Sequence, residues 1–463
     1  MLLKSSKKKE IYSREEGDSL SLIIKDIDLM VTMDRSNRIM RNASIVILGD
    51  KIVDIGSYEA LLKKWKAGEV IEGRGKIALP GLIDVHGHST QSALRGFIEE
   101  VPLMPWLTYM QDTSSKMGNE LAEIGCTITF IEKLKCGVTT SVDMENDVDL
   151  VAIVASKLGC RVILAGILAD VEEVPYSGLK RTSSVEEEIK KADHWFTKYH
   201  GKDNGRLMFF YGPVGFPASS AELLRASAER AREVGTRIHT HVAEGWITNE
   251  LCKKVHGLRE VELLEKIGFL GPDTLLAHCV QLNESDIHII SKYRASVAHC
   301  PSSNSKLGNG ICPVLELIWH DVNVGLGCDG AASNNSQDLF VEMKIAALLQ
   351  KAVHRNATIL PAQKVLQMAT IGGAKAVGLE KYIGSIEVGK KADIILIDRK
   401  KPYLIPLDNV ISHLVYNTKG DAVSTVIIDG KVIIENGRFK EFDEEGFLER
   451  AESKFSEFTG KYT

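Results

Sequence analysis

The chain has 463 residues, of which 44% are hydrophobic and 26% are charged, and its net charge at pH 7 is −5. These values are typical of an ordinary globular protein. They exclude a basic surface for nucleic acid or acidic membranes, and no apolar run approaches the roughly 18 residues that a membrane span requires.

The first segment, residues 1–18, contains basic residues that no apolar stretch follows. A secretory signal needs such a stretch, so we expect a mobile tail here and no signal peptide.

Short β-branched runs separated by turn residues fill residues 19–76 and return over residues 376–440. Both parts contain a tight-turn sequence, GDK at 49–51 and DGK at 429–431. We therefore predict that the two parts pair into one small β-sandwich domain. A terminal amphipathic helix is predicted within residues 441–463.

Residues 77–375 show a different pattern, in which an apolar β-like run and a helix-like segment alternate eight times. This alternation predicts the α/β class and a (β/α)8 TIM barrel, whose strands are apolar on both faces. The predicted strands are IALPGLIDV, TTSVDM, RVILAGIL, RLMFFYG, RIHTHVA, TLLAHC, SVAHC and VNVGLGCD.

Polar side chains gather where these predicted strands end. In a TIM barrel the reactive groups lie at the C-terminal ends of the strands, so residues far apart in the chain meet there. Packing alone does not explain so many imidazoles at one end of a barrel. The candidate residues are His86, His88, His239, His241, Glu244, His278, His299 and Asp329.

Neutral imidazoles together with a carboxylate are typical ligands of a catalytic divalent metal that leaves one position open for water. Such a metal lowers the pKa of its water to about 7. Glu244 lies three residues beyond His241 and could pass protons between that water and a substrate. Strand 4, RLMFFYGPVG, has no lysine or acidic residue to bridge a second ion, which favours one metal per chain.

With one metal, His278 is free to orient the attacking water or to polarise a substrate. His239 points the same way as His241 but one step deeper in the strand, so we expect it to support a metal ligand and not to bind the metal itself. For His299 two interpretations stay open, since it could support a ligand or face the substrate.

The eight cysteines form no CxxC pair and have mostly apolar neighbours. They are expected to be buried free thiols, which predicts a reducing, cytoplasmic location. None follows a recognisable nucleophile pattern.

The segments PGLIDVHGH, HTHVAEG, LLAHC, VAHCPSSNSKLGNGICPV, LGCDGAASNN and GSIEVGKKADIILID together resemble the amidohydrolase superfamily. More narrowly, they resemble its aminohydrolase branch, which includes 5′-methylthioadenosine/S-adenosylhomocysteine deaminases and s-triazine hydrolases. The resemblance runs from about residue 20 to residue 440.

The resemblance implies roles for individual residues and a single bound Zn²⁺, with Fe²⁺ as the alternative. Glu244 matches the acid/base glutamate, and His278 matches the histidine that contacts the attacking water or the substrate. Asp329 matches an aspartate that is both metal ligand and proton acceptor. The residues that match metal ligands are His86, His88, His241 and Asp329.

Two departures from the nucleoside deaminases concern the substrate. Those enzymes tend to carry a ribose-binding glutamate where this chain has Pro105, and a purine-contacting histidine where it has Val214. Neither side chain can supply the hydrogen bond. The GPVGFP segment is closer to the triazine-hydrolysing side of the branch, which suggests a flatter, less polar ring. The predicted substrate contacts are Gln91, Trp106, Val214, His299 and Ser333.

The resulting hypothesis is hydrolytic deamination of an amino-substituted nitrogen heterocycle, of the purine, pyrimidine, pterin or triazine type. Two alternatives use the same site, namely a triazine chlorohydrolase or alkylaminohydrolase and a cyclic amide hydrolase. A third is a non-catalytic barrel scaffold. The resemblance also implies a homodimer or larger homo-oligomer, with a small heterocycle as the ligand and neither nucleic acid nor membrane as a partner.

Overall fold

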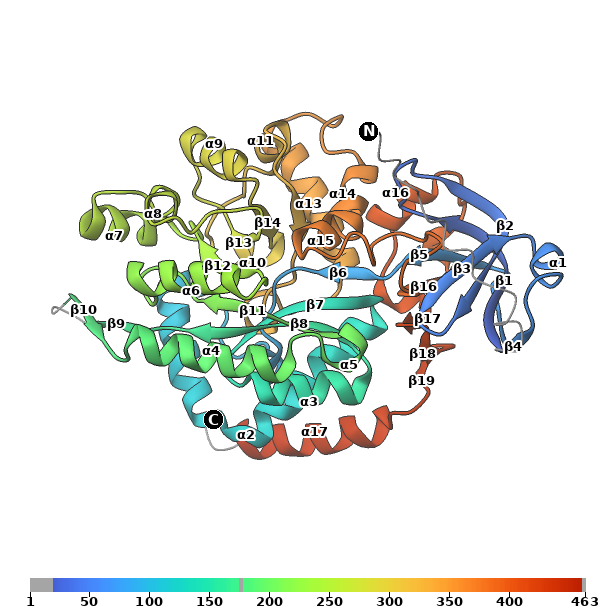
Figure 1. Ribbon diagram of the computed structural model, residues 1–463, viewed down its shortest axis with the longest axis horizontal. Helices are drawn as coiled ribbons and strands as arrows, with labels where there is room; N and C mark the ends of the chain where they lie inside the picture. Colours follow the sequence, from blue (N-terminus) through green and yellow to red (C-terminus); the bar gives the residue numbers. More distant parts are fainter. Residues whose placement is uncertain (1–19, 175–177, 460–463) are drawn as a thin grey trace, which may run out of the picture.

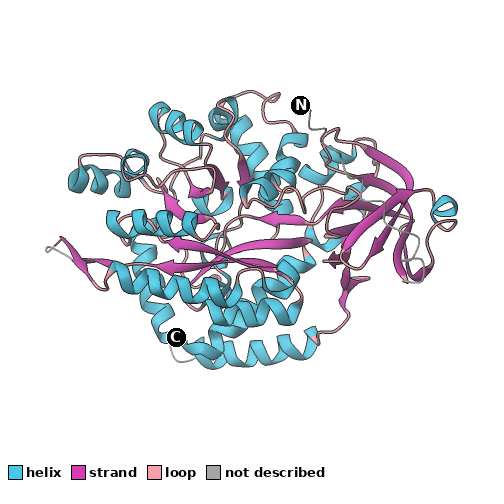
Figure 2. Cartoon of the chain, viewed as in Figure 1, coloured by secondary structure: helices cyan, strands magenta, loops and turns pink. Residues whose placement is uncertain are grey.

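The computed structural model describes residues 20–174 and 178–459, so the tail predicted over residues 1–18 lies outside the described part. Two large sheets organise the chain, one in the centre surrounded by helices and one at an end of the molecule (Figures 1 and 2). None of the helices in the described ranges combines the length and hydropathy that a bilayer crossing needs.

The central sheet has eight strands, and every neighbouring pair along it is parallel. Seven of the apolar runs of the sequence coincide with strands of this sheet, so the predicted (β/α)8 barrel is confirmed. The first run, IALPGLIDV, is divided, because Lys76–Pro80 forms a strand of the other sheet and only Leu82–Asp84 joins the barrel. In sheet order they are β6 (Leu82–Asp84), β7 (Val138–Glu145), β8 (Arg161–Leu168), β11 (Leu207–Pro213), β12 (Ile238–Val242), β13 (Thr274–His278), β14 (Ser296–His299) and β15 (Val324–Leu326).

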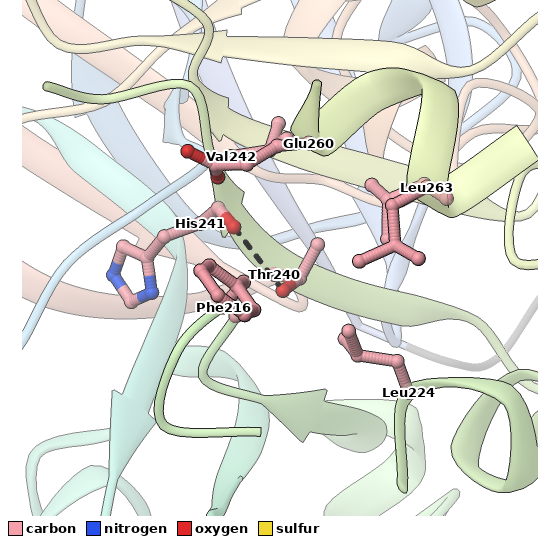
Figure 3. Close-up of a pocket in the computed structure, with 9 residues that line it drawn as sticks. Phe216, Leu224, Thr240, His241, Val242, Glu260 and Leu263 are labelled. Carbon is pink, nitrogen blue, oxygen red and sulfur yellow. Dashed lines mark hydrogen bonds between the residues drawn. The ribbon is translucent and has the colours of Figure 1, made fainter. Parts of the chain in front are cut away.

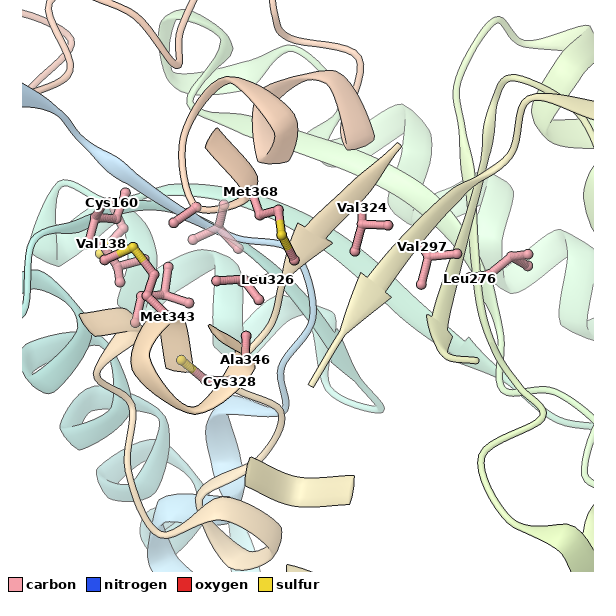
Figure 4. Close-up of a cluster of buried hydrophobic side chains, with 14 of the residues drawn as sticks. Val138, Cys160, Leu276, Val297, Val324, Leu326, Cys328, Met343, Ala346 and Met368 are labelled. Carbon is pink, nitrogen blue, oxygen red and sulfur yellow. The ribbon is translucent and has the colours of Figure 1, made fainter. Parts of the chain in front are cut away.

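Both faces of the barrel strands are buried, as parallel strands covered by helices require. Leu276, Val297 and Leu326 point outward to the helices, and Figure 4 shows this layer with side chains of α13 and α14 beside it. Alternate residues such as Leu275 and Ala298 fill the barrel interior.

Some of the helices begin at capping residues that the sequence supplies. Ser184 and Glu187 form a capping box at α4, and the side chain of Asp147 caps α3. The helices of the barrel region are α2 (Leu103–Lys135), α3 (Val148–Leu158), α4 (Val185–Tyr199), α5 (Lys202–Gly205), α6 (Ala221–Glu233), α7 (Trp246–His256), α8 (Glu260–Lys266), α9 (Glu284–Tyr293), α10 (Pro301–Lys306), α11 (Val314–Trp319), α12 (Ala331–Asn334), α13 (Leu339–Val353), α14 (Ala362–Met368) and α15 (Ile371–Ala376).

The barrel closes between its first and last strands at one short seam. Val85 N donates to Leu326 O at 3.0 Å, and Asp329 N donates to His86 O at 2.9 Å. A side chain adds a third link, since Cys328 N donates to Asp84 Oδ1 at 3.0 Å. The seam therefore ends at the candidate site residues.

The second sheet joins the two ends of the chain, as the β-rich patterns predicted. β5 pairs with β16 in antiparallel register, and the predicted turns at 49–51 and 429–431 connect β2 to β3 and β17 to β18. Its nine strands are β1 (Ser21–Val31), β2 (Ile39–Leu48), β3 (Lys51–Gly56), β4 (Ala67–Glu72), β5 (Lys76–Pro80), β16 (Ile394–Asp398), β17 (Val423–Ile428), β18 (Lys431–Glu435) and β19 (Arg438–Phe439).

Smaller elements complete the fold. α17 (Glu444–Thr459) lies along α2, where Lys135 pairs with Glu444 at 2.7 Å (Figure 1). A hairpin of β9 (Val171–Val174) and β10 (Gly178–Arg181) projects from the barrel. The remaining elements are α1 (Tyr58–Leu61), α16 (Val410–Tyr416), η2 (Ser89–Leu94), η3 (Pro402–Leu404) and η4 (Gly420–Ala422).

A buried ion pair connects the barrel to the nine-stranded sheet. Arg161, at the start of β8, donates from Nε and Nη2 to the Asp393 carboxylate at 2.7 and 3.0 Å. Arg161 is 3% exposed, and Asp429 lies 3.4 Å from its guanidinium. Because both partners have lost their water, each depends on the other for compensation.

We expect Arg161→Met to lower the free energy of unfolding by about 3–5 kcal/mol, because it leaves the Asp393 carboxylate buried without its cation. Urea denaturation measures this. Lys454→Met is the control, since it removes only exposed pairs, with Glu120 and Glu457, and should change little. Equal effects of the two variants would contradict the prediction.

Candidate functional site

Five side-chain atoms converge at the C-terminal ends of the barrel strands. One ring nitrogen each of His86, His241 and His278 lies within 4.8 Å of the others, as do a ring nitrogen each of His86 and His88 with an oxygen of Asp329. His86 and His88 follow β6, His241 and His278 lie on β12 and β13, and Asp329 follows β15. The strand ends therefore bring together all four predicted metal ligands.

The distances between these atoms suit a small cation. His88 Nε2 lies 3.4 Å from His241 Nε2 and 3.6 Å from Asp329 Oδ1, and His86 Nε2 lies 3.5 Å from the same oxygen. Four ligands in a tetrahedron at about 2.0–2.1 Å from Zn²⁺ are about 3.4 Å apart. These three contacts have the spacing of neighbouring ligands around one cation.

Hydrogen bonds behind the rings decide which nitrogen faces the centre. His88 Nδ1 donates to Met144 O at 2.6 Å, and His241 Nδ1 donates to Val214 O at 2.7 Å. With Nδ1 protonated, each neutral ring turns an Nε2 lone pair toward the centre.

His239 anchors His86 in the same way. Its Nδ1 donates to Leu275 O at 3.0 Å, so its Nε2 can accept the hydrogen bond from His86 Nδ1 at 2.8 Å. His86 Nε2 then has a free lone pair and, though buried, has no hydrogen-bond partner among the described residues. His239 therefore lies behind His86, on the side away from the converging atoms.

Burial keeps the rings neutral. It lowers the pKa of His86 and of His241 well below the usual value, and that of His239 to about 3. A set of neutral imidazoles with converging lone pairs and one carboxylate oxygen fits a divalent cation, which would neutralise the electron-rich centre.

Glu244 and His278 lie side by side next to this centre, with Glu244 Oε2 3.7 Å from His278 Nε2. Burial raises the pKa of Glu244 above its ordinary value, which favours the protonated form. His278 and Asp329 have φ angles of 71° and 63°, in the left-handed region that costs a non-glycine residue about 1–3 kcal/mol. Such strain is typical of functional positions.

A buried ion pair lies beneath the HGH segment. Asp84 Oδ1 accepts from the backbone N of His86 at 3.2 Å, and Asp84 Oδ2 lies 2.8 Å from Lys133 Nζ. Burial by itself lowers the pKa of Lys133, but the charges of Asp84 and Asp143 outweigh it and raise that pKa. A methyl group on Gly87 would lie 2.9 Å from Lys133 Nζ, so a glycine between the two histidines leaves room for the amine.

Two carboxylates at the end of β7 hold the segment that follows His88. Asp143 accepts from Ser89 N and Oγ at 2.8 and 2.6 Å, and Glu145 accepts from Thr90 N and Oγ1 at 2.8 and 2.7 Å. Burial and the charge of Asp143 raise the pKa of Glu145 to about 7.

The predicted substrate contacts lie in different environments. A methyl group added to Gly330 would lie 1.8 Å from Oε1 of Gln91. Gln91 therefore lies beside Gly330 and its neighbour Asp329. Val214 is half-buried, and its carbonyl also accepts from His241 N at 3.1 Å. Pro105 is exposed on α2.

The other three predicted contacts are buried. Trp106 packs in an apolar cluster with Leu103 and Met110. Ser333 donates to Gly330 O at 3.1 Å, as a turn-capping serine does. His299 has no partner on either ring nitrogen among the described residues, and burial lowers its pKa to about 3.

A small cavity of about 10 Å³ lies behind β12. Figure 3 shows Leu224 and Leu263 on this side of the strand, while the ring of His241 points away from it. The cavity has room for a single water at most and faces away from the converging nitrogens, so it is not the substrate site.

The sequence interpretation missed several residues around the centre. Asp84 carried a signal, a carboxylate inside the apolar run GLIDV. Lys133 carried none, because EKLK in a helix is a typical solvent-facing pattern. Three polar residues of the PSSNSKLGNG segment also face the site, and they are Ser303, Asn304 and Asn309.

Comparison with known proteins agrees with the family resemblance that the sequence motifs indicated. The model of the amidohydrolase family matches residues 77–433. The chain is 38% identical over 441 residues to a 5′-deoxyadenosine deaminase of Methanosarcina acetivorans, covering 95% of this chain and 99% of that one. It is 37% identical over 438 residues to a 5-methylthioadenosine/S-adenosylhomocysteine deaminase of Thermoanaerobacter pseudethanolicus, covering 94% and 98%.

Two solved structures share the fold over nearly the whole chain. An adenosine deaminase from Xanthomonas campestris with bound zinc has a TM-score of 0.88 and 27% identity, covering 95% of this chain and 98% of that one. The atrazine chlorohydrolase of Arthrobacter aurescens TC1 complexed with zinc has a TM-score of 0.88 and 26% identity, covering 94% and 100%.

We expect Lys133→Met to weaken zinc binding about 10-fold or more, because it leaves the Asp84 carboxylate that holds His86 buried without its cation. Zinc content after equilibration with a competing chelator measures this. Lys135→Met on the same helix is the control, because Lys135 pairs with Glu444 away from the site. Unchanged zinc affinity in Lys133→Met would contradict the role of the ion pair.

Proposed function

The chain belongs to the amidohydrolase family and is a metal-dependent hydrolase of C–N bonds, and on that premise we propose that it deaminates an adenosine-type purine. The observation that carries this proposal is the arrangement of Glu244 and His278 beside the converging donor atoms of His86, His88, His241 and Asp329. The names of the most similar relatives support the purine ring.

We assign the metal to His86, His88, His241 and Asp329, and propose Zn²⁺ as the ion because two structural neighbours contain zinc. A bound metal of this kind supplies a water whose pKa is lowered to about 7. The spacing of the four donor atoms supports the assignment.

The residues around the metal move the protons. Glu244, whose pKa is raised by burial, donates a proton to the ring nitrogen next to the reacting carbon. Water adds to that carbon, and Asp329 carries one proton of the water to the amine. The C–N bond then breaks and ammonia leaves. The remaining hydroxyl returns its proton to Glu244, so the ring keeps a carbonyl oxygen.

His278 contacts the reacting centre from β13. Its Nε2 faces Glu244 Oε2 at 3.7 Å, so it can hold the attacking water between the metal ligands and the carboxylate. Ser303 Oγ donates to Asp329 Oδ2 at 2.6 Å, which leaves Oδ1 to face His86 and His88.

A second candidate reaction is hydrolytic dechlorination of a triazine ring. It is favoured by Val214, which cannot hydrogen-bond a purine, and by the fold shared with the atrazine chlorohydrolase. Chloride release from a chloro-s-triazine, without ammonia release from any purine, would establish it.

Two further expectations belong to this proposal. We place the enzyme in a reducing, cytoplasmic environment, because all eight cysteines are free thiols and seven of them are buried. The homodimer or larger homo-oligomer implied by the family resemblance stays a prediction.

We expect Glu244→Gln to lower kcat/KM for the purine about 10²–10⁴-fold while the protein keeps its metal, because the amide cannot transfer the proton. Ammonia release and metal analysis of the same sample measure both. Glu250→Gln on α7, where the glutamate pairs with Lys253, is the control and should retain activity. Loss of the metal from Glu244→Gln would mean that this carboxylate is a ligand.

We also expect sugar hydroxyls to matter little. Pro105 and Val214 offer no side-chain hydrogen bond to a nucleoside. A site that is built to hydrogen-bond a hydroxyl, in contrast, strongly rejects an analogue without that hydroxyl. Values of kcat/KM for adenosine, 2′-deoxyadenosine and 3′-deoxyadenosine should therefore agree within about threefold. A loss of 100-fold or more for either deoxynucleoside would show that another residue binds the ribose.

A further inference from the structure

One short segment after β14 contacts three groups of the proposed machinery. Ser303 Oγ donates to Asp329, and Asn309 Nδ2 donates to Glu244 Oε1 at 3.1 Å. Between them in the chain, Asn304 Oδ1 lies 3.0 Å from His278 Nδ1. Ser303 is 0%, Asn304 1% and Asn309 7% exposed, so each contact is shielded from water.

The Asn304 contact decides which nitrogen of His278 carries the proton. With Oδ1 facing the ring, Nδ1 must be protonated, and the neutral ring presents an Nε2 lone pair. His88 and His241 are held in the same way by backbone carbonyls. Behind His278, the acceptor for Nδ1 is the side chain of Asn304 and not a backbone carbonyl.

The opposite orientation of the amide is disfavoured by the charge at the centre. If Asn304 Nδ2 faced the ring, His278 would carry its proton on Nε2, the nitrogen turned away from Asn304, on a ring that has a nitrogen within 4.8 Å of a ring nitrogen of His86 and of His241. A proton there would point at the cation that these nitrogens bind. The Oδ1 orientation avoids this and leaves Nδ2 without a partner among the described residues.

We propose that Asn304 is a positioning residue that keeps His278 protonated on Nδ1, so that its Nε2 accepts a hydrogen bond from the attacking water. His278 thereby orients a lone pair of the water toward the ring carbon and does not itself donate a proton. The role in turnover rests on the proposed function, whereas the protonation state of the ring does not.

The first test is spectroscopic and uses the zinc-loaded protein without substrate. ¹⁵N chemical shifts of the ring-labelled histidines distinguish protonated from unprotonated nitrogens, and the signal of His278 is identified by its absence in His278→Gln. We expect a protonated Nδ1 and an unprotonated Nε2 in the parent and in Asn304→Asp, whose carboxylate can only accept. In Asn304→Leu we expect a mixture of tautomers.

The second test is kinetic, with the purine substrate. We expect Asn304→Leu to lower kcat about 10–100-fold with KM changed less than about twofold, and Asn304→Asp to restore kcat to within about tenfold of the parent. Asn323→Leu is the matched control, since Asn323 donates to Ser296 Oγ and Gly372 O at the opposite end of the barrel. It removes comparable hydrogen bonds and should leave kcat unchanged.

The outcomes separate the two proposals. A protonated Nε2 in the parent would overturn the role of Asn304, and so would Asn304→Leu with an unchanged His278 ring and unchanged kcat. Lower activity in Asn304→Asp than in Asn304→Leu would do the same. If neither the parent nor any variant releases ammonia, but the ring signals behave as expected, the proposed function fails and the positioning role stands.

Discussion

The structure depends on one electrostatic constraint, which is that imidazole nitrogens and a carboxylate oxygen lie close together: His88 Nε2 is 3.4 Å from His241 Nε2, and Asp329 Oδ1 is 3.5 Å from His86 Nε2 and 3.6 Å from His88 Nε2. Lone pairs at this spacing repel unless a cation lies among them, so the fold has to hold the rings in place from behind. It does so mainly with backbone carbonyls, of Met144 for His88 and of Val214 for His241. These acceptors also select the tautomer that a metal requires.

The seam of the barrel maintains much of this arrangement. Strands β6 and β15 lead into three of the four proposed ligands and meet where the barrel has to close. Asp84 connects the two strands through His86 N and Cys328 N, and Lys133 compensates its charge. A buried ion pair contributes little net stability compared with apolar residues of similar size. We therefore infer that this pair serves to fix the positions of His86 and Cys328.

Val214 illustrates how such a site can change its substrate without losing its metal. The backbone carbonyl of Val214 anchors His241, whereas its side chain is half-buried and makes no hydrogen bond. A different side chain at this position would therefore leave the hydrogen bond between the Val214 carbonyl and His241 in place.

The sequence by itself determined the barrel, its eight strands and the convergence of the histidines. These follow from local periodicity, because alternation places His86 and His88 on one face and parallel strands bring their C-terminal ends together. The tertiary structure alone decided that Lys133 is buried beneath the HGH segment and that Asn304 lies behind His278. Such contacts join side chains that are far apart in the chain, and they depend on how helices pack against the barrel, which no short stretch of sequence encodes.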